Sequence, residues 1–185
     1  KSSEVKKNSL ETSLEYTLDD SPLTAVVDEK LRLSTTNNHT AAHLMHEALR
    51  QVLGEHVNQA GSFVSPEILR FDFTHFEKVS EEQMEKIENI VNAVIRKNIP
   101  TDIYETPFQE AIDSGITALF GEKYGDVVRV VKIAEFSEEL CGGCHVKATG
   151  QIGQFRMFSE EAIASGVRRV VALTGREAEL MNQAQ

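Results

Sequence analysis

The sequence predicts an α+β domain in which a mainly antiparallel sheet packs against helices. Helical and strand-like segments are interspersed, and several strand pairs are too closely linked for the crossovers that parallel strands need. Hydrophobic residues make up 41% and charged residues 26% of the 185 residues, which is ordinary for a globular chain with one well-buried domain. No apolar run is long enough to span a bilayer, and no signal-peptide pattern opens the chain. We therefore expect a cytoplasmic protein without a membrane partner.

The first long helix is predicted from an asparagine cap and an apolar stripe. Asn37 or Asn38 can cap a helix that runs to about Leu53, with Gly54 as its C-terminal stop. Residues 23–33 can form a separate short helix before it.

Shorter patterns predict the remaining elements. Strands are expected at 63–64, 68–73, 103–105, 126–134, 152–158 and 167–173. Helices are expected at 80–98, at 107–114 and from 175 to the end. Ser80 and Gln83 form a capping-box pattern at the start of the first of these helices, and Pro107 suits the first position of the second.

The chain is expected to hold one main domain at residues 23–175. Residues 1–22 are polar and read as a linker or the remnant of a preceding domain, and residues 176–185 begin a C-terminal helix or linker. The chain begins with Lys1, so we expect it to be part of a longer polypeptide. Its net charge of −10 argues against a free-standing nucleic-acid binder, although a module that receives one end of an RNA held elsewhere remains compatible.

Two motifs about a hundred residues apart offer the ligands of a metal site. His39 and His43 are four apart in a helical pattern, so they project from one face. Cys141 and His145 belong to a CGGCH turn, whose glycines let both side chains face one ion. Two histidines, a cysteine and a histidine are a tetrahedral zinc set, and thiolate with imidazole favours Zn²⁺ over magnesium or calcium.

Other histidines and the second cysteine have plainer interpretations. His46 continues the face of the histidine pair, so it could be a rival ligand, although we expect it to pack beside the ligands. His56 and His75 are expected at the surface or with satisfied hydrogen bonds. Cys144 is expected in the pocket wall. Two cysteines three apart do not form a disulfide framework, and they suit a reducing compartment with a metal-bound thiolate.

Longer segments around these motifs resemble the editing domains of alanyl-tRNA synthetases. The segments are NHTAAHLMH (38–46), ALRQVLG (48–54), QAGS (59–62), LRFDF (69–73), ELCGG (139–143), TGQIG (149–153) and GVRR (166–169). They cover about residues 25–175 in the family's order and spacing. The resemblance implies the fold of the threonyl/alanyl-tRNA synthetase second additional domain.

The resemblance also implies a hydrolase that removes wrongly attached serine or glycine from alanine tRNA. The metal ligands that it implies are His39, His43, Cys141 and His145. The implied partners are the 3′ acceptor end of alanine tRNA and the remainder of the parent synthetase. The alternatives within the same class are the editing domain of threonyl-tRNA synthetase and a free-standing deacylase.

Matching positions imply further site residues. Gln59 would lie at the substrate pocket, and Arg168 would contact the acyl end or the terminal adenosine. The backbone N–H groups of Gly142 and Gly143 are candidate oxyanion or phosphate contacts. Ala42 would form the pocket wall where the family usually has threonine, so discrimination of a serine hydroxyl must rest on another group or be weaker.

Two mechanisms stay open at this point. Zinc can lower the pKa of a bound water to about 7, but four protein ligands close its coordination shell. Either Cys141 yields its place to water or substrate, or zinc only shapes the pocket while neighbours such as Gln59 act on the water. Cys144, where the family usually has threonine, could compete as a ligand or oxidise with Cys141.

Two other functional classes are compatible with the motifs. The CGGCH turn matches the C-x-x-C-H pattern of haem c attachment, although that reading leaves His39 and His43 unexplained and attachment normally occurs outside the cytosol. A non-catalytic zinc module would use the same four ligands. A visible absorption spectrum separates haem from zinc, and a deacylation assay separates the hydrolase from the inert module.

Overall fold

The computed structural model describes residues 25–118 and 123–183. The helices are α1 (Glu29–Leu53), α2 (Glu81–Arg96), α3 (Phe108–Asp113), η1 (Thr149–Ile152, a 3-10 helix) and α4 (Gly175–Gln183). The strands are β1 (Gln59–Val64), β2 (Leu69–Thr74), β3 (Asp102–Pro107), β4 (Val127–Ile133), β5 (Ser137–Leu140), β6 (Phe155–Ala164) and β7 (Val167–Thr174). The predicted linker at residues 1–22 lies outside the described residues.

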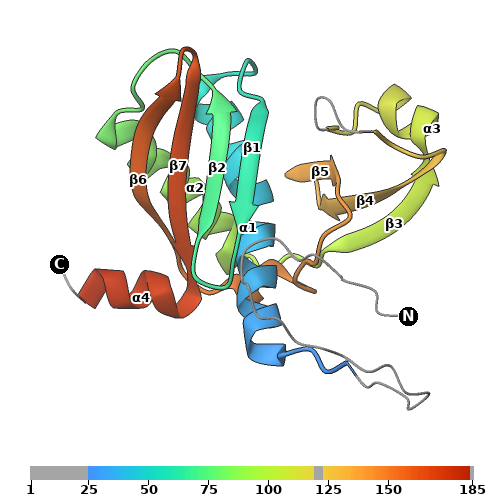
Figure 1. Ribbon diagram of the computed structural model, residues 1–185, viewed down its shortest axis with the longest axis horizontal. Coiled ribbons are helices and arrows are strands. Elements are labelled where there is room, and N and C mark those ends of the chain that lie inside the picture. The colour runs from blue at the N-terminus through green and yellow to red at the C-terminus, as the bar shows by residue number, and fades with distance from the viewer. Residues whose placement is uncertain (1–24, 119–122, 184–185) are drawn as a thin grey trace, which may run out of the picture.

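The strands form two antiparallel sheets, which confirms the predicted α+β class (Figure 1). One sheet has the order β1-β2-β7-β6, and the smaller sheet has the order β3-β4-β5. Helix α1 contacts β2 and β7 of the larger sheet and also β5 of the smaller one. It therefore lies in contact with both sheets. No helix in the described ranges is long and apolar enough to cross a membrane.

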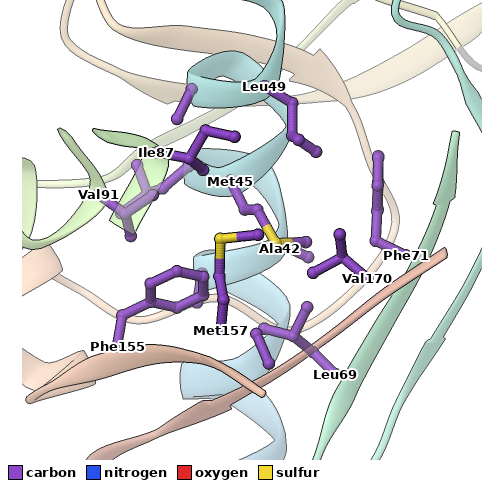
Figure 2. Packing of buried hydrophobic residues seen from close by; sticks show 14 of the residues in the cluster. Ala42, Met45, Leu49, Leu69, Phe71, Ile87, Val91, Phe155, Met157 and Val170 are labelled. Atoms are coloured by element: carbon purple, nitrogen blue, oxygen red, sulfur yellow. The ribbon is translucent and has the colours of Figure 1, made fainter. Parts of the chain in front are cut away.

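The main core lies between α1, α2 and the larger sheet. Figure 2 shows Met45 and Leu49 of α1 beside Ile87 and Val91 of α2. The sheet residues drawn with them are Leu69, Phe71, Phe155, Met157 and Val170. Burying side chains of this size stabilises the fold by about 1.5–3 kcal/mol each, so the core holds α1 rigidly against the sheet.

Helix α1 is one continuous helix rather than the two predicted segments. It begins after Asp28, whose carboxylate accepts a hydrogen bond from the Leu31 amide at 3.0 Å. The predicted cap Asn38 lies inside the helix and is buried. Its amide donates to the Ser65 carbonyl at 2.8 Å, and its Oδ1 accepts from the Thr174 hydroxyl at 2.6 Å. The asparagine therefore ties α1 to the sheet instead of capping it.

Most other predicted elements are present with shifted ends. The capping box is confirmed, because Ser80 Oγ accepts from the Gln83 amide and Gln83 Oε1 accepts from the Ser80 amide. The strand predicted at 152–158 begins later, since η1 precedes β6. Strand β5 was not predicted. It leads directly into Cys141 and so positions one half of the candidate site.

Candidate metal centre

The two motifs converge on one point. His39 and His43 lie one turn apart on α1, and Cys141 and His145 lie in the turn after β5. One ligand atom from each of these four residues lies within 4.8 Å of the other three. Cys141 Sγ is 3.4 Å from His39 Nε2 and 3.3 Å from His145 Nε2.

These separations fit a small tetrahedral ion. A zinc–sulfur bond of about 2.3 Å and zinc–nitrogen bonds of about 2.0–2.1 Å place tetrahedral ligand atoms about 3.3–3.6 Å apart. The two sulfur–nitrogen distances of 3.4 and 3.3 Å fall at or near that spacing. The donor set therefore could hold a metal ion without a large movement of the chain.

The three imidazoles pack against one another inside the site. The ring centroid of His145 lies 4.4 Å from that of His39 and 4.6 Å from that of His43. Burial, with a smaller contribution from the neighbouring His43, lowers the pKa of His39 to about 4 and that of His145 to about 2. Burial also lowers the pKa of His43 itself. All three rings are neutral near pH 7, which is the form that binds a metal.

The glycine turn is held in place from β4. The Arg129 guanidinium donates to the carbonyl of Cys141 at 2.6 Å and to that of Gly143 at 2.9 Å. A Cβ atom on Gly143 would lie 1.9 Å from Cε1 of His39, so only glycine allows this approach. A Cβ atom on Gly142 would instead extend into open space. The Gly143 amide donates to Cys141 Sγ at 3.4 Å, so it faces the sulfur.

A small pocket of about 60 Å³ borders the four-residue group. His39, His43 and Cys141 form part of its wall, and the predicted site residues Ala42 and Gln59 line it as well. The remaining lining residues are Ser62, Val64, Phe71, Glu139 and Leu140. Gln59 Nε2 donates to Ser62 Oγ at 3.2 Å, which places two polar groups across from the ligands.

Arg168 and Cys144 lie outside this pocket lining. Arg168 forms an ion pair with Glu160 on the neighbouring strand β6, with 2.8 Å between Nη2 and Oε2. Cys144 is exposed, and Arg32 on α1 donates to its sulfur at 3.0 Å. Its thiol is outside the four-residue group.

The remaining histidines also lie apart from the four-residue group. The exposed His56 and the half-buried His75 meet at 2.8 Å between Nε2 and Nδ1. His46 is buried, with its Nδ1 3.3 Å from Glu139 Oε1.

Three polar residues around the site were not predicted from the motifs. Thr40 and Arg129 contact the ligand residues through hydrogen bonds. Glu139 is buried between His43 and His46. Burial alone raises the pKa of Glu139, but the two histidines and Ser137 outweigh it and the net shift is downward. Glu139 lies two residues before Cys141, and alternation along a strand would have turned both inward had β5 been recognised.

Comparison with known proteins shows which proteins this chain is similar to. A model described as "Threonyl and Alanyl tRNA synthetase second additional domain" matches residues 128–171. Alanine–tRNA ligase of Carboxydothermus hydrogenoformans is 62% identical over 152 residues, covering 82% of this chain and 17% of that protein. The Pseudothermotoga lettingae ligase is 60% identical over 150 residues (81% and 18%), and that of Geobacillus kaustophilus is 57% identical over 155 residues (84% and 18%).

The chain spans less than a fifth of the length of these relatives. The high identity along most of the chain confirms the resemblance to alanyl-tRNA synthetases that the motifs indicated. Over most of its length the chain is similar to one segment of these alanine–tRNA ligases, and its residues 128–171 match the second additional domain model.

Proposed function

We propose that this chain is a zinc-dependent editing hydrolase that deacylates alanine tRNA mischarged with serine or glycine. The observation that carries the proposal is the shared location of two features. Four ligand atoms lie within 4.8 Å of one another, and three of their residues line a pocket that also holds Gln59. The relatives are alanine–tRNA ligases, and the proposal concerns the part of such an enzyme that this chain spans.

The donor chemistry favours zinc. A thiolate with three imidazoles is a ligand set for a borderline-soft ion, and hard ions such as magnesium prefer oxygen. When bound, zinc supplies a positive charge beside the scissile ester, which polarises it and stabilises negative charge as it develops.

The anchored turn favours the mechanism in which Cys141 remains a ligand. Arg129 donates hydrogen bonds to the carbonyls of the residues on both sides of Gly142, and Sγ of Cys141 accepts a hydrogen bond from the Gly143 amide. Releasing the sulfur would disturb these contacts. If all four protein ligands are retained, the coordination shell of the ion is closed. The ion then shapes and polarises the pocket, and other residues must position the water.

Gln59 is suited to that positioning role. Its amide nitrogen donates to Ser62, which leaves the amide oxygen to accept a hydrogen bond from the attacking water and so to orient it. Ala42 offers a flat apolar wall beside the ligands. We propose that the Ser62 hydroxyl and the Gln59 amide meet the polar groups of the aminoacyl end that Ala42 cannot bind.

The charge of the chain limits how it meets RNA. With a net charge of −10, it lacks the excess of basic residues that supports tight binding to phosphates. We propose that it receives only the 3′ acceptor end, in the cytoplasm, while the remainder of the parent synthetase holds the tRNA.

Metal analysis coupled to deacylation tests the proposal. The wild-type chain is expected to contain zinc and to hydrolyse seryl- and glycyl-tRNA of the alanine acceptor, and His43→Ala to lose both properties. Full activity of a metal-free His43→Ala protein would refute the zinc mechanism. Bound zinc without deacylation would favour a non-catalytic module, and preference for seryl-tRNA of the threonine acceptor would favour the threonyl class.

A further inference from the structure

Glu139 on β5 lies between two histidines of α1. Its Oε1 is 3.3 Å from His46 Nδ1, and its Oε2 is 3.7 Å from His43 Nδ1. Only 6% of the Glu139 surface is exposed. We propose that Glu139 is a positioning residue, which keeps the proton of His43 on Nδ1 and thereby turns Nε2 toward the metal centre. The inference rests on the metal site of the proposed function and adds a residue to it.

The hydrogen bonds around the carboxylate leave one oxygen for His43. Ser137 Oγ donates to Oε1 at 3.3 Å, and the same oxygen faces His46 Nδ1. Oε2 faces His43. An ionised carboxylate only accepts hydrogen bonds, so a buried one favours N–H groups on the ring nitrogens beside it.

His46 supports Glu139 from the opposite side. Its Nε2 has no hydrogen-bond partner among the described residues, and the side chain borders a second pocket of about 180 Å³. A neutral imidazole carries one proton, and the contact with Glu139 places it on Nδ1. His46 therefore acts as a donor that fixes the carboxylate, and it does not bind the ion.

The backbone that carries Glu139 is fixed on both sides. Strand β5 pairs with β4 on one edge and forms a bridge with Thr117 on the other. The Leu140 amide donates to the Thr117 carbonyl at 2.8 Å, and the Thr117 amide donates to the Glu138 carbonyl at 3.1 Å. The carboxylate is thus presented to α1 by a strand that cannot shift freely.

A carboxylate behind a ligand histidine orients the ring and raises its basicity, and losing such a group typically costs 10–100-fold in metal affinity. The test is zinc affinity of the 185-residue chain, measured by competition with a chromophoric chelator. Glu139→Gln keeps the size of the side chain and removes its charge. We expect it to bind zinc about 10–100-fold more weakly and to alter the visible spectrum of the cobalt-substituted protein.

Asp72→Asn is the matched control. Asp72 is also largely buried and forms a two-bond ion pair with Arg169 at 2.7 and 2.8 Å, away from the residues of the metal centre. Its loss should lower the melting temperature without changing zinc affinity or the cobalt spectrum. This comparison separates positioning from a general loss of stability.

Two substitutions of His46 keep the test decisive if Glu139→Gln does not fold. His46→Asn can place an amide N–H where Nδ1 stood and should retain zinc affinity, whereas His46→Leu removes the donor and should weaken binding. Wild-type affinity and an unchanged cobalt spectrum in Glu139→Gln, or in His46→Leu, would overturn the positioning role. Failure of the wild-type chain to bind zinc would instead refute the proposed function.

Discussion

Thr40 Oγ1 lies 3.2 Å from His145 Nδ1, although 105 residues of sequence separate them. The hydroxyl donates to the Thr36 carbonyl within α1 at 3.1 Å and accepts from the Val146 amide at 3.0 Å. A hydroxyl has a single proton, so the histidine must be the donor in their contact. The proton of His145 is therefore on Nδ1, and its Nε2 faces Cys141 as a free lone pair.

Thr40→Val is expected to weaken both the fold and the metal centre. Valine has the same shape but leaves the buried Val146 amide without its acceptor, which costs about 1–3 kcal/mol of unfolding free energy. Urea unfolding with and without zinc measures the two effects. Thr40→Ser keeps the hydroxyl and should retain zinc binding, and equal zinc affinity in the valine and serine variants would contradict the assignment.

Gly143→Ala is expected to abolish metal binding. The new Cβ would lie 1.9 Å from Cε1 and 2.4 Å from Nδ1 of His39, so the turn and the ligand cannot both keep their places. Gly142→Ala is the adjacent control, because no heavy atom lies within 4 Å of its Cβ position. The measurement is the zinc content of both variants after dialysis. Stoichiometric zinc in Gly143→Ala would show that the turn does not depend on this close approach.

Zinc binding near pH 7 is expected to release about one proton. The pKa values of His39, at about 4, and His145, at about 2, lie below the working pH, so these rings are already neutral and release no proton when the metal binds. Burial raises the pKa of the Cys141 thiol, which therefore binds its proton until the metal displaces it. The apparent zinc affinity should rise about tenfold per pH unit below that pKa.

Calorimetry in buffers of different ionisation enthalpy counts these protons. Release of two protons would add Cys144 to the ligand set, and release of none would exclude a thiolate ligand. Cys144→Ser should leave the count unchanged.

Gln59→Ala is expected to keep zinc while slowing deacylation about 100-fold, the size of effect that follows when a reacting group is misplaced. Gln59 lines the pocket, but it is outside the four-residue group. Within the described residues, the half-buried Gln59 side chain donates to the exposed Ser62, so stability should change little. Zinc analysis and single-turnover deacylation of seryl-tRNA are the paired measurements. Loss of zinc together with activity would assign Gln59 a structural role instead.

Local patterns in the sequence were enough to predict those elements whose signals are short in range. The spacing of His39 and His43, the capping box at Ser80 and the apolar periodicity of α2 all depend on neighbours within one or two helical turns. The predicted start of α1 was wrong because the Asn38 side chain hydrogen-bonds to Ser65 and Thr174 instead of capping a helix. Only the tertiary fold brings these two residues near.

Strand β5 and the surroundings of the ligands could not be predicted in the same way. Two of the four residues of β5 are glutamates, so its sequence resembles that of a polar loop. Its strand conformation is evident only from the backbone pairing with β4 and Thr117. The ion pair of Arg168 with Glu160 likewise depends on the register of β6 against β7. The ligand residues were visible in sequence, whereas the groups that orient them were not.

Helix α1 supplies two ligands, and the loop that follows the smaller sheet supplies the other two. An ion coordinated by both would act as a cross-link between positions 102 residues apart, as between His39 and Cys141. Closing a chain loop of that length restricts the unfolded state by about 4–5 kcal/mol in the entropic treatment of cross-links. Metal occupancy would then decide whether the smaller sheet melts together with the main core or ahead of it.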